Sequence, residues 1–180
     1  ASRYESVVDE LKEELDAAPA HGDTFWTAAL GPEETLDLLG ERIDAATDRV
    51  VVVAGVPGSG FDLTEVGERM TDRLAVAAGR GVAVRVLVTT ALVGNAPDTV
   101  HQRYAGDLTD RDGFAVRVSD EVEGSFVLLD DDEVCIEVPN PLDGEDPFAT
   151  INLKDAAFVA DARDAFRARW ESADPLPAGD

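Results

Sequence analysis

Residues 49–90 read RVVVVAGVPGSGFDLTEVGERMTDRLAVAAGRGVAVRVLVTT, and this stretch decides the fold. Residues 49–54 (RVVVVA) form an apolar run bounded by polar residues and a Gly/Pro loop, a pattern typical of a strand covered on both faces. Apolar residues then recur every four positions from 66 to 78, which predicts a helix. A second β-branched run occupies 82–89. Strand, helix and strand in this order predict a right-handed crossover between parallel strands.

The flanking segments extend this pattern. TFWTAAL at 24–30 predicts a strand, and Pro32 with the acids Glu33 and Glu34 opens a helix, because proline suits the first turn and acids suit its positive end. Downstream we expect a helix after Pro97, a strand at 114–118, a hairpin of 125–129 with 133–138, a strand at 149–153 and a helix at 156–170. The sequence predicts an α/β fold with a largely parallel or mixed sheet flanked by helices.

The N-terminal segment carries an apolar stripe at helical spacing between residues 5 and 15. A helix of this length is marginal in water unless it packs against something. We therefore expect it to pack on its own domain or on a partner, and we predict a homodimer that uses this helix. The stripe consists of Val7, Val8, Leu11 and Leu15.

The composition restricts the possible functions. The chain has 180 residues, with 38 acidic and 15 basic side chains and a formal charge of −23. Nucleic-acid binding needs clustered Lys and Arg, so this chain is not expected to bind DNA itself. No apolar run approaches the roughly 18 to 20 residues of a membrane span, so we expect a cytoplasmic protein without membrane contact. The acidity and scarcity of lysine resemble proteins of halophilic archaea; an ordinary acidic protein is the alternative.

Several short motifs contain residue types that can bind phosphate or metal ions. Residues 58–60 (GSG) follow a strand but lack the Gly-Lys-Ser/Thr of a phosphate loop, so a plain turn is favoured. The acids at 130–133 lie at a hairpin tip, where alternate side chains diverge, and a solvated turn is favoured over a cation site. His21 and His101 lack metal-site spacing, and the lone Cys135 is expected to be buried and inert. We expect no metal, no cofactor and no catalytic residue.

The segments TFWTAAL, IDAATDRVVVVAG and LAVAAGRGVAVRVLVTT, together with AGRGVAVR at 78–85, carry a family resemblance. They resemble the C-terminal effector domain of TrmB-family archaeal transcription regulators, a domain similar to the phospholipase D-like fold. An active enzyme of that fold needs His-x-Lys-x-x-x-x-Asp, in which His attacks phosphorus and Lys stabilises the charge. With Asp131 as the acid, the His and Lys positions hold Gly124 and Phe126; with Asp130, they hold Glu123 and Ser125. The resemblance therefore implies a non-hydrolytic member.

The resemblance also implies a role. In TrmB-like regulators a winged helix-turn-helix binds DNA, a connecting helix pairs two subunits, and the C-terminal domain senses a small metabolite, often a sugar. Because the chain begins with Ala1, we expect that the DNA-binding part is missing from it. The chain then divides into a connecting and dimerisation helix at 1–17, a phospholipase D-like effector domain at 18–174 and an acidic tail at 175–180. Sugar-binding members carry a further β-rich subdomain, whereas this chain ends soon after Trp170.

A ligand site is predicted beyond the carboxyl ends of the parallel strands, where loops converge in open α/β sheets. The polar residues predicted for this site are uncharged, and they suit a polyol or another uncharged metabolite. Two alternatives are a phosphodiesterase of phospholipase D-like fold and a structural dimerisation module without ligand. The predicted site residues are Ser59, Thr89 and Thr90 at the strand ends, Ser125 and Asn140 on the degenerate strand and its loop, and Trp26 as a wall.

Overall fold

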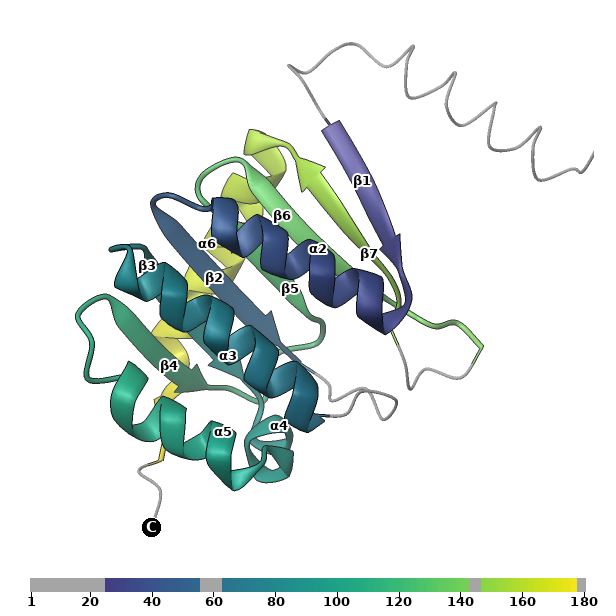
Figure 1. Cartoon of the computed structure of the whole chain (residues 1–180). Coiled ribbons are helices and arrows are strands. Elements are labelled where there is room, and N and C mark those ends of the chain that lie inside the picture. The colour runs from purple at the N-terminus through teal and green to yellow at the C-terminus, as the bar shows by residue number, and fades with distance from the viewer. Residues whose placement is uncertain (1–24, 56–62, 143–146, 178–180) are drawn as a thin grey trace, which may run out of the picture.

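The computed structural model describes residues 25–55, 63–142 and 147–177. The predicted helix at 5–15, its dimerisation stripe and the GSG loop with Ser59 lie outside these residues. The described chain forms one eight-stranded sheet with helices on both faces (Figure 1). The strand order is β1-β7-β6-β5-β2-β3-β4-β8. The α/β fold with a mixed sheet is thus confirmed.

The expectation of a largely parallel sheet needs correction. Only the pairs β2–β3 and β3–β4 are parallel, and the other five neighbouring pairs are antiparallel. β1 runs in the same direction as β2, but the strands β5, β6 and β7 lie between them, so the first crossover spans half the sheet. The strands are β1 (Phe25–Leu30), β2 (Arg49–Ala54), β3 (Ala83–Val88), β4 (Phe114–Val118), β5 (Phe126–Leu129), β6 (Glu133–Pro139), β7 (Pro147–Lys154) and β8 (Asp174–Pro175).

The helices divide the core into two layers. α2 (Gly31–Ala45), α3 (Leu63–Gly79), α5 (Asp98–Gln102) and the π-helix η1 (Arg103–Leu108) cover one face of the sheet, and α6 (Ala156–Ser172) covers the other (Figure 1). A short α4 (Thr90–Asn95) follows β3. Buried side chains of alternating strand positions fill each layer, which is the pattern of a strand buried on both faces.

Local sequence explains where the helices begin. α2 starts at Gly31, whose φ of +76° suits glycine, and carries Pro32 and two acids in its first turn, as predicted. The Asp155 carboxylate accepts a hydrogen bond from Phe158 N at 3.1 Å and caps α6. Thr89 caps α4 in the same way, because its Oγ1 accepts from Leu92 N at 3.2 Å. α4 is an element that the sequence pattern does not predict, and the helix expected after Pro97 is α5 continued by η1.

A buried polar network links α2 to the antiparallel strands. Arg42 donates to both carboxylate oxygens of Glu133, and the side chain of Glu133 is only 8% exposed. The Asn152 side-chain amide donates to Glu133 Oε1 at 2.9 Å and to Cys135 Sγ at 3.3 Å. The hydrogen bond to Glu133 raises the pKa of Arg42 above its ordinary value. Cys135 is buried, as expected, and burial raises the pKa of its thiol to about 11, so it stays protonated at neutral pH.

Candidate functional site

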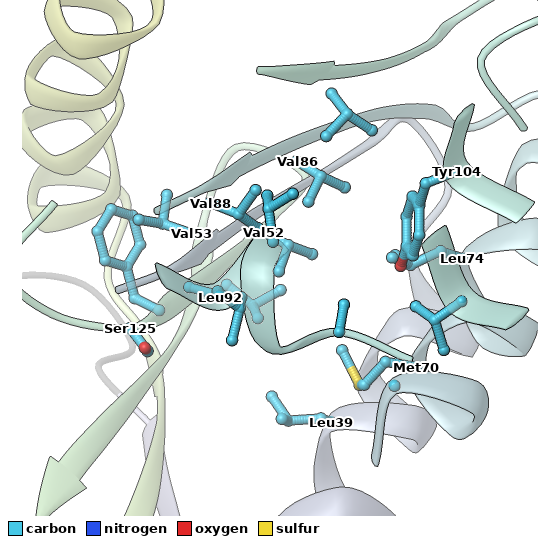
Figure 2. A pocket seen from close by; sticks show the side chains of 18 of the residues that line it. Leu39, Val52, Val53, Met70, Leu74, Val86, Val88, Leu92, Tyr104 and Ser125 are labelled. Atoms are coloured by element: carbon cyan, nitrogen blue, oxygen red, sulfur yellow. The ribbon is translucent and has the colours of Figure 1, made fainter. Parts of the chain in front are cut away.

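A cavity of about 250 Å³ lies between the sheet and the helices α2, α3, α5 and η1, next to the carboxyl ends of the parallel strands (Figure 2). The strand register explains its floor. Residues that pair across the sheet point to the same face, so the floor consists of two rows of cross-strand neighbours. The outer row runs through Thr150, Glu137, Ser125, Ala54 and Val88, and the inner row through Cys135, Val127, Val52, Val86 and Val116.

The helices provide a mostly apolar roof. Leu39 of α2, Met70 and Leu74 of α3 and Leu92 of α4 point their side chains over the valines of the floor (Figure 2). Tyr104 comes from η1 and lies at the side of the cavity opposite Ser125 (Figure 2). Apolar cavities that contain a few convergent polar groups are typical small-molecule sites.

Three polar side chains converge on the β5–β6–β7 part of the floor. Ser125 Oγ accepts a hydrogen bond from Gly55 N at 3.1 Å. This close approach needs glycine, since a Cβ at residue 55 would lie 2.9 Å from the carbonyl oxygen of Gly124. Glu137 is partly buried, and burial raises the pKa of its carboxyl group. Thr150 is 2% exposed, and its Oγ1 has no hydrogen-bond partner within the part of the chain that the structure describes.

Other polar groups of the lining are already engaged or less central. The Tyr104 hydroxyl accepts a hydrogen bond from Thr71 Oγ1 at 3.2 Å, and burial raises the pKa of Tyr104. His101 lines the cavity from α5. Among the described lining residues there is no Lys or Arg. The described lining thus offers no ammonium or guanidinium group for a phosphate or carboxylate ligand.

The structure places the predicted site residues in several locations. Ser125 lines the cavity. Thr89 and Thr90 lie at the carboxyl end of β3 but start α4: Thr89 is its cap, and Thr90 donates through N and Oγ1 to the Asp120 carboxylate at 3.0 and 3.1 Å. Asn140 Oδ1 accepts from Leu142 N at 2.9 Å, outside the described lining.

Trp26 is separated from this group. It pairs with Leu153 on the edge strand β1, in a cross-strand row whose other members pack against α6, so it lies on the face of the sheet opposite the cavity, and it is 50% exposed. The interpretation of Trp26 as a wall of the same cleft is therefore not supported by its position. Sequence reasoning missed Glu137 and Thr150. The position of Glu137 could have been predicted, because it lies two residues after Cys135 and therefore on the same strand face, which was expected to be buried.

The strand that the family resemblance aligns with the catalytic motif is β5 with its flanking residues. Asp130, at φ +52°, accepts hydrogen bonds from the amides of Thr47, Asp48 and Arg49 at 3.2, 2.7 and 3.2 Å. Burial alone would raise the pKa of Asp130, but these bonds outweigh it and lower the pKa. Asp131 is instead exposed and pairs with Arg49 at 3.0 Å.

The described residues contain no group of three or more His, Cys, Asp or Glu side chains that could hold a metal ion. Within the same ranges, no helix is both long and apolar enough to cross a bilayer.

Solved structures share the fold. The archaeal chromatin protein TrmBL2, whose structure shows a novel mode of DNA binding, matches with a TM-score of 0.63 and 17% identity over 97% of this chain and 62% of that chain. Nuc, a phospholipase D family member from Salmonella typhimurium, matches with a TM-score of 0.65 and 13% identity over 86% of this chain and 99% of its own. NucT from Helicobacter pylori matches with a TM-score of 0.63 and 13% identity over 86% of this chain and 100% of its own.

At these identities the likeness shows the fold alone, and it confirms the phospholipase D-like architecture. The chain spans less than two thirds of the length of TrmBL2. A search of curated proteins finds no significant sequence match. A family profile covers residues 20–176, nearly all of the sheet and its helices, and on this match the chain belongs to the family described as Domain of unknown function (DUF7436).

Proposed function

We propose that this chain is a non-catalytic, ligand-sensing domain of a TrmB-like transcription regulator. The observation that carries the proposal is the cavity of about 250 Å³ at the carboxyl ends of the parallel strands, with an apolar lining and a few convergent polar groups. Cavities of this position and composition bind small molecules in open α/β sheets. The likeness to TrmBL2, itself a DNA-binding protein, supports a regulator over an isolated binding protein.

The absence of catalysis is part of this proposal. Neither register of the degenerate motif supplies a His or a Lys, and a phosphodiester-cleaving site of this fold needs both a nucleophile and a cation. The likeness to Nuc and NucT makes phosphodiesterase activity the second candidate. A phosphodiesterase assay with and without EDTA tests this candidate. A hydrolytic activity that exceeds the rate in buffer and copurifies with the intact chain would overturn the non-catalytic assignment.

In this proposal, another part of the regulator binds DNA, because a domain with a formal charge of −23 would repel the DNA phosphates. Several described arginines are also engaged by carboxylates: Arg69 with Asp37 at 2.8 Å and Arg103 with Asp72 at 2.7 Å are examples. A homodimer through the stripe at 7–15 belongs to the same proposal. Sedimentation of the intact regulator at molar salt tests it, and a strictly monomeric protein would contradict it.

The sensing role is tested by a thermal-shift screen of small metabolites against the intact chain and two variants. Val88→Phe places a ring into the cavity, because Val88 lies on its floor. Val76→Phe adds the same ring on the exposed side of α3, where Val76 is 56% exposed. A sensing domain should show metabolite-induced shifts that Val88→Phe abolishes and Val76→Phe keeps. Shifts that both variants keep, or no shift from any metabolite, would contradict ligand sensing in this cavity.

A further inference from the structure

The cavity has two chemically different sides. On the side of β2, β3 and β4, its floor consists of valine and alanine side chains. On the side of β5, β6 and β7, three polar side chains stand next to one another in one cross-strand row, namely Ser125, Glu137 and Thr150. A ligand that fits both sides has an apolar body and one polar head.

The buried hydroxyl of Thr150 indicates that the head is a hydrogen-bonding group. Thr150 lines the cavity, is 2% exposed and has no partner for Oγ1 among the described residues. A buried hydroxyl without a partner destabilises a protein by about 1–3 kcal/mol, so such groups are rare unless something binds them. Thr150 pairs across the strands with Glu137, which places both side chains at the same spot on the floor.

The charge of the head follows from Glu137. No hydrogen bond or ion pair joins its carboxyl group to another described residue, and burial raises its pKa. The described lining holds no Lys or Arg, and no hydrogen bond or ion pair joins Glu137 to His101, the histidine of the roof. An anionic head would face a carboxylate without a compensating Lys or Arg. A cationic donor instead satisfies the carboxylate, and the hydroxyl groups of Ser125 and Thr150 flank Glu137 on the neighbouring strands as further acceptors.

We propose that the cavity binds a small apolar primary amine as its ammonium ion, with the ammonium group between Glu137, Thr150 and Ser125 and the hydrocarbon over the valines of β2, β3 and β4. This proposal rests on the proposed sensing function and specifies its ligand class. It replaces the polyol expected from the sequence, because a polyol would leave hydroxyl groups against the apolar side of the cavity.

The test uses three probes with one hydrocarbon and different heads: hexylammonium, hexanol and hexanoate. Isothermal titration of the intact chain at 1 M KCl and pH 8 gives each affinity, and the high salt screens the general attraction of cations to an acidic surface. We expect hexylammonium to bind at least tenfold more tightly than hexanol, and hexanoate more weakly than both. Val88→Phe should abolish binding of all three.

Three variants locate the head group. Glu137→Gln should weaken hexylammonium about tenfold and leave hexanol within about twofold, since a charge-assisted hydrogen bond becomes a neutral one. Thr150→Val should weaken hexylammonium severalfold and provides a second variant if Glu137→Gln does not fold. Glu171→Gln, an equal charge change at an exposed position of α6, should leave both probes unchanged.

Each failure has a distinct meaning. Equal affinity for hexylammonium and hexanol, tighter binding of hexanoate, or an unchanged hexylammonium affinity in Glu137→Gln would overturn the ammonium site. If metabolite shifts sensitive to Val88→Phe exist but hexylammonium does not bind, the ligand class is wrong and the sensing function stands. If nothing responds to Val88→Phe, both proposals fail.

Discussion

The two halves of the sheet bury different chemistry on the same face. Beneath α3, the parallel strands β2, β3 and β4 contribute valine after valine to the core. Beneath α2, the antiparallel strands β6 and β7 contribute Glu133, Cys135, Glu137, Thr150 and Asn152 to positions that are buried or partly buried. The strand positions of the first half are apolar, whereas those of the second half carry a polar network in which the side chains of Glu137 and Thr150 have no hydrogen-bond partner among the described residues.

This difference separates two kinds of stabilisation within one layer. Apolar burial needs no partner, whereas a buried polar group stabilises the fold only when all of its hydrogen bonds are made. Arg42, Glu133 and Asn152 satisfy one another. Thr150 and Glu137 have no such partners among the described residues. We therefore expect substitutions in the polar half to change the free energy of unfolding by amounts that depend on the residue. In the valine half, we expect polar substitutions to destabilise the fold and apolar substitutions to be tolerated better.

The largest expected effect comes from breaking the buried ion pair of the polar half. Arg42→Ala leaves Glu133, 8% exposed, without its cation, and should lower the free energy of unfolding by about 3–4 kcal/mol. Arg73→Ala, which removes an exposed pair with Asp44, should change it by less than about 1 kcal/mol. Urea denaturation of both variants measures the difference. Equal effects would show that the polar network does not hold this half together.

A hydroxyl introduced into the valine half should come next. Val84 is fully buried, and Val84→Thr keeps its shape while burying a hydroxyl group, so we expect a loss of about 2 kcal/mol. Val76→Thr on the exposed side of α3 serves as the control and should stay within about 0.5 kcal/mol of the wild type. An unchanged Val84→Thr protein in the same urea titration would mean that the apolar half accommodates polar groups as well.

The reverse substitution in the polar half should have the opposite sign. Thr150→Val removes a buried hydroxyl without a partner and should stabilise the ligand-free protein by about 1 kcal/mol, visible as a higher melting temperature. Stabilisation by removal of a polar group marks a position retained for something other than stability. Destabilisation by Thr150→Val would instead assign the hydroxyl a structural role.

The smallest effect concerns pH. Because burial raises the pKa of folded Glu137 above its ordinary value near 4.5, the group binds a proton more readily in the folded protein than in the unfolded one. Its ionisation therefore destabilises the fold as pH rises through the raised pKa. Glu137→Gln should be more stable than the wild type at pH 7.5, and this advantage should disappear below about pH 4. Urea titrations at both pH values test this, and a constant difference would contradict it.

Local elements were predictable from the sequence, and long-range pairing was not. The strands at 49–54 and 114–118 match β2 and β4 because each is bounded by its own turn signals. The β5–β6 hairpin was predicted as well, because its turn is local. The place of β1 was not, since its partner β7 lies more than a hundred residues away and no local pattern specifies it.

The same reason limits the prediction of the site. Ser125 was found because it starts a strand with a family resemblance. Glu137 and Thr150 become neighbours only through the register of β6 with β7, which the sequence pattern does not fix. Thr89 was assigned to a ligand although a threonine between a strand and a helix is also an N-cap signal, and the structure shows it in that role.

The pairing of the edge strand β1 affects when the sheet can form during synthesis on the ribosome. Residues 25–30 are synthesised before any other described strand, yet the strand that pairs with them, β7, is completed at Lys154. At about 5–20 residues per second, translation separates the two by roughly 6 to 25 s. During that interval Trp26 and Leu30 belong to a nascent chain in which the partner strand of β1 has not yet been made. The order of synthesis and the order of pairing are opposed at this edge, so β1 can join the sheet only after Lys154 has been synthesised.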